Sequence, residues 1–140
     1  MAATSVLVDT GPLVAYLNAR DRHHAWASAC WNVLFEPLIT CEAVLSEATF
    51  VLQSDGADVD PLLQLVERRL VRVEFAFKDH EADVIRLLRK YADQPMSVAD
   101  ACLVRMAELT DRCRVFTTDR DFRVYRRKGR HVIPILAPFA

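Results

Sequence analysis

The sequence predicts an α/β protein built on a parallel sheet that helices cover on both faces. Short aliphatic runs alternate with longer segments of helical periodicity along the chain. The first run, Ser5-Val6-Leu7-Val8, leads straight into Asp9 and then into an apolar helical pattern. Parallel strands joined by helices are buried on both sides, which explains why these runs are continuously apolar.

Length and composition indicate one compact domain over residues 1–140. The chain is 52% hydrophobic and 26% charged, which argues against a disordered or fibrous protein and allows one sizeable core. The net charge of −1 excludes a uniformly basic nucleic-acid binder, although it allows a local basic patch. We recognise no secretory signal and no apolar run of about 20 residues, so we expect a cytoplasmic protein without a membrane segment.

The four cysteines are widely spaced among apolar neighbours, and no Cys-x-x-Cys pair occurs. This pattern argues against a zinc site. It favours reduced, buried thiols at Cys30, Cys41, Cys102 and Cys113.

Element boundaries follow from apolar periodicity and turn residues; Pro12, for example, suits the first turn of a helix. The predicted strands are 5–9, 37–40, 70–75, 114–117 and 131–135. The predicted helices are 12–19, 22–35, 42–53, 59–68, 79–92 and 98–110, with a short helix near 120–127.

Two acidic residues follow predicted strands. Asp9 ends the first strand, and Asp119 comes just after Val115-Phe116-Thr117-Thr118. Ligands of parallel sheets bind beyond the carboxyl ends of the strands, so we expect both carboxylates at that edge. Each also has a plainer explanation, since Asp9 can hold a turn and Asp119 can cap the short helix after it.

Two further carboxylates lie on predicted helices. Glu47 has apolar residues one turn away on both sides, so we expect it in the stripe that faces the core. A buried charge there must be protonated, bound to a cation or paired with an arginine. Asp100 continues an apolar helical face, but Ser97-Val98-Ala99-Asp100 also fits a capping box.

Taken together, the four acids predict a cation site. Clustered carboxylates repel one another, which raises their pKa values unless a cation compensates. Oxygen ligands without histidine or cysteine favour Mg²⁺ or Mn²⁺. Convergence on a cation explains all four placements at once, although spacing alone leaves the separate structural explanations open.

These residues resemble the motifs of PIN-domain ribonucleases, in particular the VapC-type toxins of bacterial toxin–antitoxin pairs. The opening strand and acid of that family are matched by Val6-Leu7-Val8-Asp9-Thr10, and its helical glutamate by Leu45-Ser46-Glu47-Ala48. Its third acid is matched by Ser97-Val98-Ala99-Asp100-Ala101, and its late Thr-x-Asp-x-Asp-Phe by residues 117–122. The resemblance covers essentially the whole chain.

The resemblance implies a three-layer α/β/α sandwich with a central, mostly parallel sheet of about five strands. It also implies Mg²⁺-dependent endonucleolytic cleavage of RNA, with Mn²⁺ as a possible substitute, a cognate antitoxin protein and a homodimer. Asp121 would be a further metal ligand, and Thr10 and Thr117 would support the ligands. The catalytic and metal-binding residues that it implies are Asp9, Glu47, Asp100 and Asp119.

A basic run follows the late acids, and we interpret it as a phosphate-binding rim beside a site that otherwise repels RNA. A solvated helix face is the alternative interpretation. The predicted RNA-binding residues are Arg120, Arg123, Arg126, Arg127 and Lys128.

Two other functions are left open. A PIN-type domain can serve in RNA processing or RNA binding without being a toxin. A haloacid-dehalogenase-like phosphatase also starts with an aspartate after a strand, but that family needs a second aspartate two residues later. Gly11 occupies that position here, which argues against the phosphatase.

Overall fold

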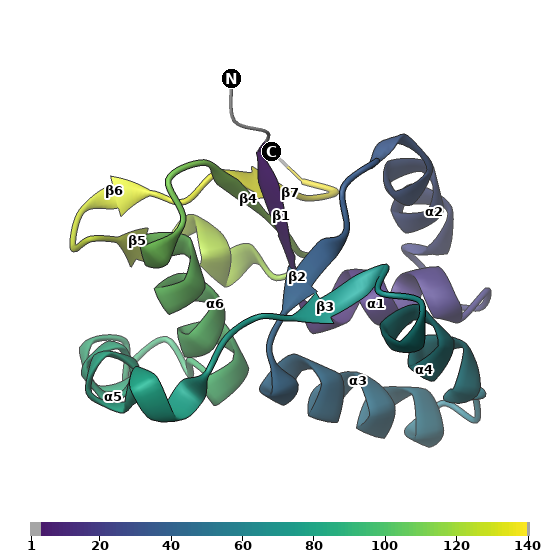
Figure 1. Ribbon diagram of the computed structural model, residues 1–140, viewed down its shortest axis with the longest axis horizontal. Helices are drawn as coiled ribbons and strands as arrows, with labels where there is room; N and C mark the ends of the chain where they lie inside the picture. Colours follow the sequence, from purple (N-terminus) through teal and green to yellow (C-terminus); the bar gives the residue numbers. More distant parts are fainter. Residues whose placement is uncertain (1–3, 140) are drawn as a thin grey trace.

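The computed structural model describes residues 4–139 as a five-stranded parallel sheet between helices, with a separate two-stranded antiparallel hairpin (Figure 1). The sheet strands are β1 (Ser5–Val8), β2 (Leu38–Thr40), β3 (Val71–Val73), β4 (Cys113–Phe116) and β7 (Ile135–Leu136). The hairpin strands are β5 (Arg126–Arg127) and β6 (His131–Val132). The helices are α1 (Thr10–Leu17), α2 (His24–Val33), α3 (Glu42–Ser54), α4 (Asp60–Glu67), α5 (Glu81–Lys90) and α6 (Val98–Leu109), with 3₁₀ turns η1 (Phe77–Asp79) and η2 (Arg120–Arg123).

The strand order is β3-β2-β1-β4-β7, and every pair in this sheet is parallel. The chain moves outward from β1 to β2 and β3, then returns to place β4 on the other side of β1. This reversal brings the carboxyl ends of β1 and β4 side by side, where open α/β sheets bind their ligands. Val8 pairs with Phe116, so Asp9 and Thr117 follow at equivalent positions.

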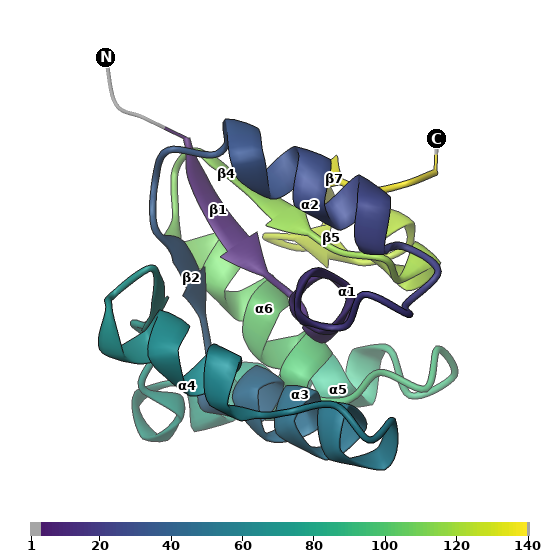
Figure 2. The same ribbon diagram turned by 90° about the vertical axis from the view of Figure 1, so that its right-hand side faces the viewer.

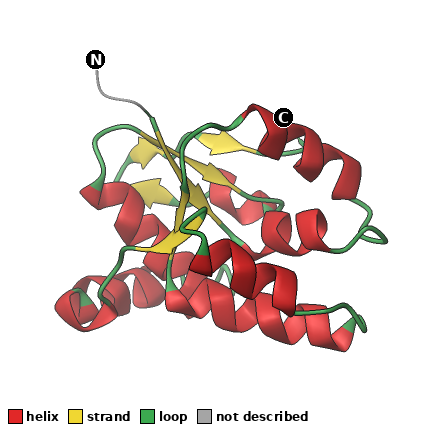
Figure 3. Ribbon diagram, turned by 45° about the vertical axis from the view of Figure 1, so that its right-hand side comes forward, coloured by secondary structure: helices red, strands yellow, loops and turns green. Residues whose placement is uncertain are grey.

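Helices cover both faces of the sheet, which confirms the expected α/β/α layers. In Figure 1, β1 lies between α6 on one side and α1 and α2 on the other, and Figure 2 shows α2 in front of the strands with α6 behind them. The Phe116 ring of β4 packs against Trp26 and Trp31 of α2, at centroid distances of 5.4 and 6.4 Å. The strands are thus enclosed by helices, as the colouring of Figure 3 makes clear.

The central elements are the most buried. Val6, Leu7 and Val8 of β1 are each at most 2% exposed, which accounts for the continuous apolar run at the start of the sequence. Nine of the twelve residues of α6 are buried, because this helix packs on the sheet and also contacts α3 and α5. Between residues 4 and 139, no helix is long and apolar enough to span a membrane. All four cysteines are free, and three of them are buried.

The predicted elements are correct except near the carboxyl end. The helix predicted near 120–127 is only the short turn η2, since Arg126 and Arg127 form β5 instead. The strand predicted at 131–135 is two strands, β6 and β7, which pair with different partners. Pro134 lies between them and has no N–H to donate, which helps to separate them.

Gly11 allows α1 to approach the loop after β4. A Cβ atom at this position would overlap the hydroxyl of Thr118, whose other side-chain atoms are also within 3.3 Å. The missing side chain therefore lets the first turn of α1 lie against the segment that leads to Asp119.

The substitution Gly11→Ala should lower the free energy of unfolding by about 1–3 kcal/mol, because the added methyl group forces α1 and Thr118 apart. Thr118→Ala removes the overlapping hydroxyl, so the double variant should recover part of that loss. Urea denaturation of the parent, both single variants and the double variant measures the coupling. Strictly additive losses would contradict the steric explanation.

Candidate metal centre

Three carboxylates meet beyond the carboxyl ends of β1 and β4. One oxygen each from Asp9, Asp100 and Asp119 lies within 4.8 Å of the other two, and these residues form the acidic site. Asp9 directly follows β1, Asp119 comes after β4, and Asp100 lies in the first turn of α6. The sequence predicted the convergence of four acids, and the structure brings three of them together.

Asp9 is held on both sides of its carboxylate. Oδ1 accepts a hydrogen bond from the Thr10 N–H at 2.8 Å, which caps α1, and Oδ2 accepts one from the Thr117 hydroxyl at 2.7 Å. The Thr117 hydroxyl in turn accepts a hydrogen bond from the Asp119 N–H at 2.9 Å. Burial raises the pKa of Asp9 to about 7; the bonds from Thr117 and Thr10 oppose this shift, and the charges of Asp100 and Asp119 add to it.

Asp100 takes part in a capping box and also lies in the acidic site, so both placements that the sequence left open occur together. Its Oδ2 accepts from the Ser97 N–H at 3.2 Å while its own N–H donates to the Ser97 hydroxyl at 3.0 Å, which completes a capping box. The Tyr125 hydroxyl donates to the same Oδ2 at 3.2 Å. Burial raises the pKa of Asp100, and the charges of Asp119 and Glu47 act in the same direction. The capping box therefore positions Asp100 within the acidic site.

The hydrogen bond from Tyr125 to Asp100 is a contact that the sequence does not reveal. Tyr125 is fully buried, and its ring packs edge-on against Phe122 and Tyr91. The only signal in the sequence is an aromatic residue with a hydroxyl inside a run of arginines, which does not identify Asp100 as its acceptor.

Asp119 and Asp121 share one turn. Oδ1 of Asp119 accepts from the Asp121 N–H at 2.9 Å, so Asp119 also caps η2, as the plainer explanation predicted. Asp121 is half-buried, and burial followed by the charge of Asp119 raises its pKa. In the described chain it is not one of the three carboxylates that converge, and its part as a metal ligand stays a prediction.

Glu47 lies at the margin of the acidic site, and the expectation that it is buried in an apolar stripe is wrong. Glu47 is exposed, and Phe50, one turn away, is 69% exposed. No arginine pairs with Glu47 in residues 4–139; instead its Oε2 accepts from the Thr10 hydroxyl at 2.9 Å. The buried residues of α3 recur every four positions: Val44, Ala48 and Leu52.

The basic run does not form one helix face, because Arg120 and Arg123 lie in the short turn η2 whereas Arg126 and Arg127 form β5. The Arg126 guanidinium donates to three backbone carbonyls at 2.7–3.1 Å. The Arg127 guanidinium donates at 2.8 Å to the carbonyl of Thr110, which precedes β4 and so lies at the other end of that strand from Asp119. The Lys128 side chain is exposed at the hairpin turn, while Arg120 and Arg123 lie in η2 with Asp121. RNA binding by these five residues stays a prediction.

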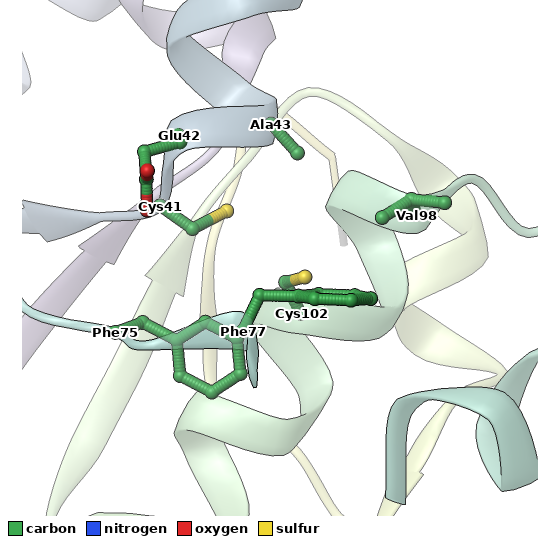
Figure 4. A pocket seen from close by; sticks show the side chains of 7 residues that line it. All are labelled: Cys41, Glu42, Ala43, Phe75, Phe77, Val98 and Cys102. Atoms are coloured by element: carbon green, nitrogen blue, oxygen red, sulfur yellow. The ribbon is translucent and has the colours of Figure 1, made fainter. Parts of the chain in front are cut away.

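An apolar cavity of about 280 Å³ lies between the first turns of α3 and α6. Figure 4 shows the thiols of Cys41 and Cys102 facing it, together with the rings of Phe75 and Phe77. Glu42 is the one carboxylate in its lining, so this cavity offers no set of oxygen ligands. Among residues 4–139, the acidic site is the one cluster of three or more side chains that could hold a cation.

Comparison with known proteins agrees with the resemblance found in the sequence. Residues 6–128 match the sequence profile of the PIN domain. The Mycobacterium tuberculosis ribonuclease VapC26 is 28% identical over 119 residues, which cover 82% of this chain and 87% of that protein. The crystal structure of Mycobacterium tuberculosis VapC20 shows the same fold, with a TM-score of 0.73 at 24% sequence identity. The match covers 84% of this chain and 92% of VapC20, which is described as a toxin that cleaves the sarcin–ricin loop.

The cation-free protein should lose stability as the pH rises from about 4 to about 7. Folding raises the pKa of Asp9 from 3.8 to about 7, so the folded state binds more protons than the unfolded state in this window. The total loss should be of the order of a few kcal/mol. Urea unfolding in EDTA across this pH range measures it.

Asp9→Asn removes this titration and should flatten the stability curve between these pH values. The matched control is Asp93→Asn, which changes an exposed loop carboxylate and should keep the parent's pH dependence. Saturating Mg²⁺ should reduce the loss in the parent, because a bound cation favours the ionised carboxylate. The same slope in parent and Asp9→Asn would contradict the raised pKa.

Proposed function

This chain belongs to the PIN-domain family, and from that membership we propose that it is a metal-dependent endoribonuclease acting as the toxin of a toxin–antitoxin pair. The convergence of Asp9, Asp100 and Asp119 within 4.8 Å carries the proposal. The similarity to a protein named ribonuclease VapC26 supports the reaction. The toxin role rests on the resemblance of the sequence motifs to VapC-type toxins.

The acidic site fits a hard divalent cation. It offers only carboxylate oxygens, which suit Mg²⁺ or Mn²⁺ rather than zinc. Burial and mutual repulsion raise the pKa of Asp9 and Asp100, and a bound cation would remove that conflict. Asp9, Asp100 and Asp119 would hold the ion, with Glu47 and Asp121 as further ligands at the margin.

A divalent cation supplies Lewis acidity for hydrolysis of a phosphodiester and neutralises the charge that builds on it. The chain's own residues orient the carboxylates for this task. The Thr117 hydroxyl fixes Asp9 relative to Asp119, and the Tyr125 hydroxyl fixes Asp100. Side chains held in this way need little reorganisation when substrate binds, which favours catalysis.

RNA binding is proposed chiefly for the part of the basic run near the acidic site. Arg120 and Arg123 lie in η2, the turn that Asp119 caps, so they are well placed to meet phosphates there. Arg126 and Arg127 also donate their guanidinium groups to backbone carbonyls, and Lys128 lies at the hairpin turn. RNA binding by these three residues stays part of the proposal. The proposal also includes a cognate antitoxin protein, a homodimer and action in the cytoplasm, where the RNA substrate is found.

Purified protein should cleave RNA in Mg²⁺ or Mn²⁺, and EDTA should stop the reaction. Asp119→Asn should slow cleavage by about two orders of magnitude or more, since it removes one negative ligand while an amide oxygen can still cap η2. Asp93→Asn, in an exposed loop, is the control and should cleave like the parent. Gel analysis of a labelled RNA shows the result, and full activity in EDTA would refute the mechanism.

Expression of the chain alone should arrest the growth of a bacterial host, and co-expression with the cognate antitoxin should restore it. Asp119→Asn should not arrest growth, because arrest requires cleavage of RNA. Colony counts after induction measure the effect. Harmless expression of a protein that does cleave RNA would instead favour the RNA-processing role.

A further inference from the structure

A second cavity borders the acidic site on the side of the loop between α1 and α2. Its volume of about 350 Å³ lies in the range of small-molecule binding sites. The α1–α2 cavity is lined by residues that include Thr10, Val14, Arg22, His23, Val51 and Thr118.

Residues that line the α1–α2 cavity are neighbours of the proposed cation ligands in the sequence or form hydrogen bonds with them. Thr10 directly follows Asp9 and donates its hydroxyl to Glu47 at 2.9 Å. Thr118 directly precedes Asp119. Two residues that line the cavity are thus the direct chain neighbours of two proposed cation ligands, Asp9 and Asp119.

Arg22 supplies positive charge at the α1–α2 cavity. Its side chain is exposed, and its Nε donates to Nε2 of His23 at 3.1 Å. No carboxylate forms an ion pair with Arg22 in the described part of the chain. Asp21, the one acid in the lining, accepts the His23 N–H on Oδ1 at 2.9 Å. The terminal amino groups of Arg22 thus remain available for two parallel hydrogen bonds to a phosphate.

We propose that the α1–α2 cavity is the subsite for the nucleotide next to the scissile phosphate of a single-stranded RNA. Arg22 binds the phosphate of that nucleotide, and Val14, Val51 and the His23 ring contact its sugar and base. The guanidinium and the hydroxyl groups of this cavity suit the phosphate of a nucleotide, and its apolar side chains suit the flat face of a base. This subsite rests on the ribonuclease function proposed above.

The test compares Arg22→Gln with Arg68→Gln, which makes the same change of charge elsewhere. Arg68 is also exposed and follows α4 shortly before β3 begins, near the amino end of that strand, whereas the acidic site lies at the carboxyl ends of β1 and β4. For a short single-stranded RNA, Arg22→Gln should raise KM about tenfold with kcat almost unchanged, because the contact forms in both bound and transition states. The slope of log(kcat/KM) against log salt should shrink by about one. Arg68→Gln should behave like the parent.

Oligonucleotides shortened from each end locate the contact. Loss of the nucleotide that occupies the cavity should remove the difference between the parent and Arg22→Gln, and shortening from the other end should preserve it. Melting temperatures of both variants should equal that of the parent, since both arginines are exposed.

Three outcomes would overturn the subsite. If Arg22→Gln matches Arg68→Gln for every RNA, the subsite fails while the ribonuclease function stands. If the parent does not cleave RNA at all, the proposed function fails first and the subsite with it. If RNA kinetics are normal but inhibition by the antitoxin weakens, the cavity binds a protein ligand instead.

Discussion

The hydroxyl of Thr117 joins the two strand ends on which the acidic site is built. It is completely buried, donates to Asp9 and accepts from the backbone of Asp119. Asp9 then caps α1 through the Thr10 N–H. One buried oxygen therefore fixes the end of β1, the end of β4 and the start of α1 relative to one another. A side chain without this hydroxyl would leave a buried carboxylate oxygen without its donor, which is among the costly changes in a protein interior.

The sheet topology makes that contact possible. Because Val8 and Phe116 are paired in the parallel register, the residues that follow them, Asp9 and Thr117, lie at equivalent positions beyond the two strand ends. On the other side of β1, the buried Thr40 hydroxyl donates to the carbonyl of Val8 at 2.8 Å, so the end of this strand is held from both neighbours. The same rigidity forces the carboxylates together, and their burial raises the pKa of Asp9 and Asp100. Local conflicts of this kind, which cost stability, are typical of functional sites.

The parts of the site that the sequence reveals are those whose position depends on local structure. Asp9 and Asp119 were predictable because each follows an apolar strand, and Asp100 because its capping box lies at a helix start. The prediction for Glu47 is wrong, because apolar neighbours one turn away do not define the buried face of α3. Phe50 is one of those neighbours and faces solvent, and only the packing of α3 against the rest of the fold decides which stripe is covered.

The errors at the carboxyl end have a similar origin. The hairpin β5–β6 turns through Lys128 and Gly129, both with positive φ, and lysine is an unusual residue for that conformation. Nor does residue type show whether an arginine faces solvent. The sequence does not show, for example, that the Arg126 guanidinium donates to three backbone carbonyls.

Two arginines lie in the segments that follow the strand ends on which the acidic site is built. Arg22 lies in the loop that follows α1, the helix that begins at the end of β1, and Arg120 lies in η2 just after β4. Arg22 lines the α1–α2 cavity together with Thr10 and Thr118. The guanidinium carbon of Arg120 lies 4.7 Å from the ring centroid of Phe139. In the function proposed above, the segments that follow the two strand ends would thus supply positive charge for a polyanion beside the negative charge that would hold a cation.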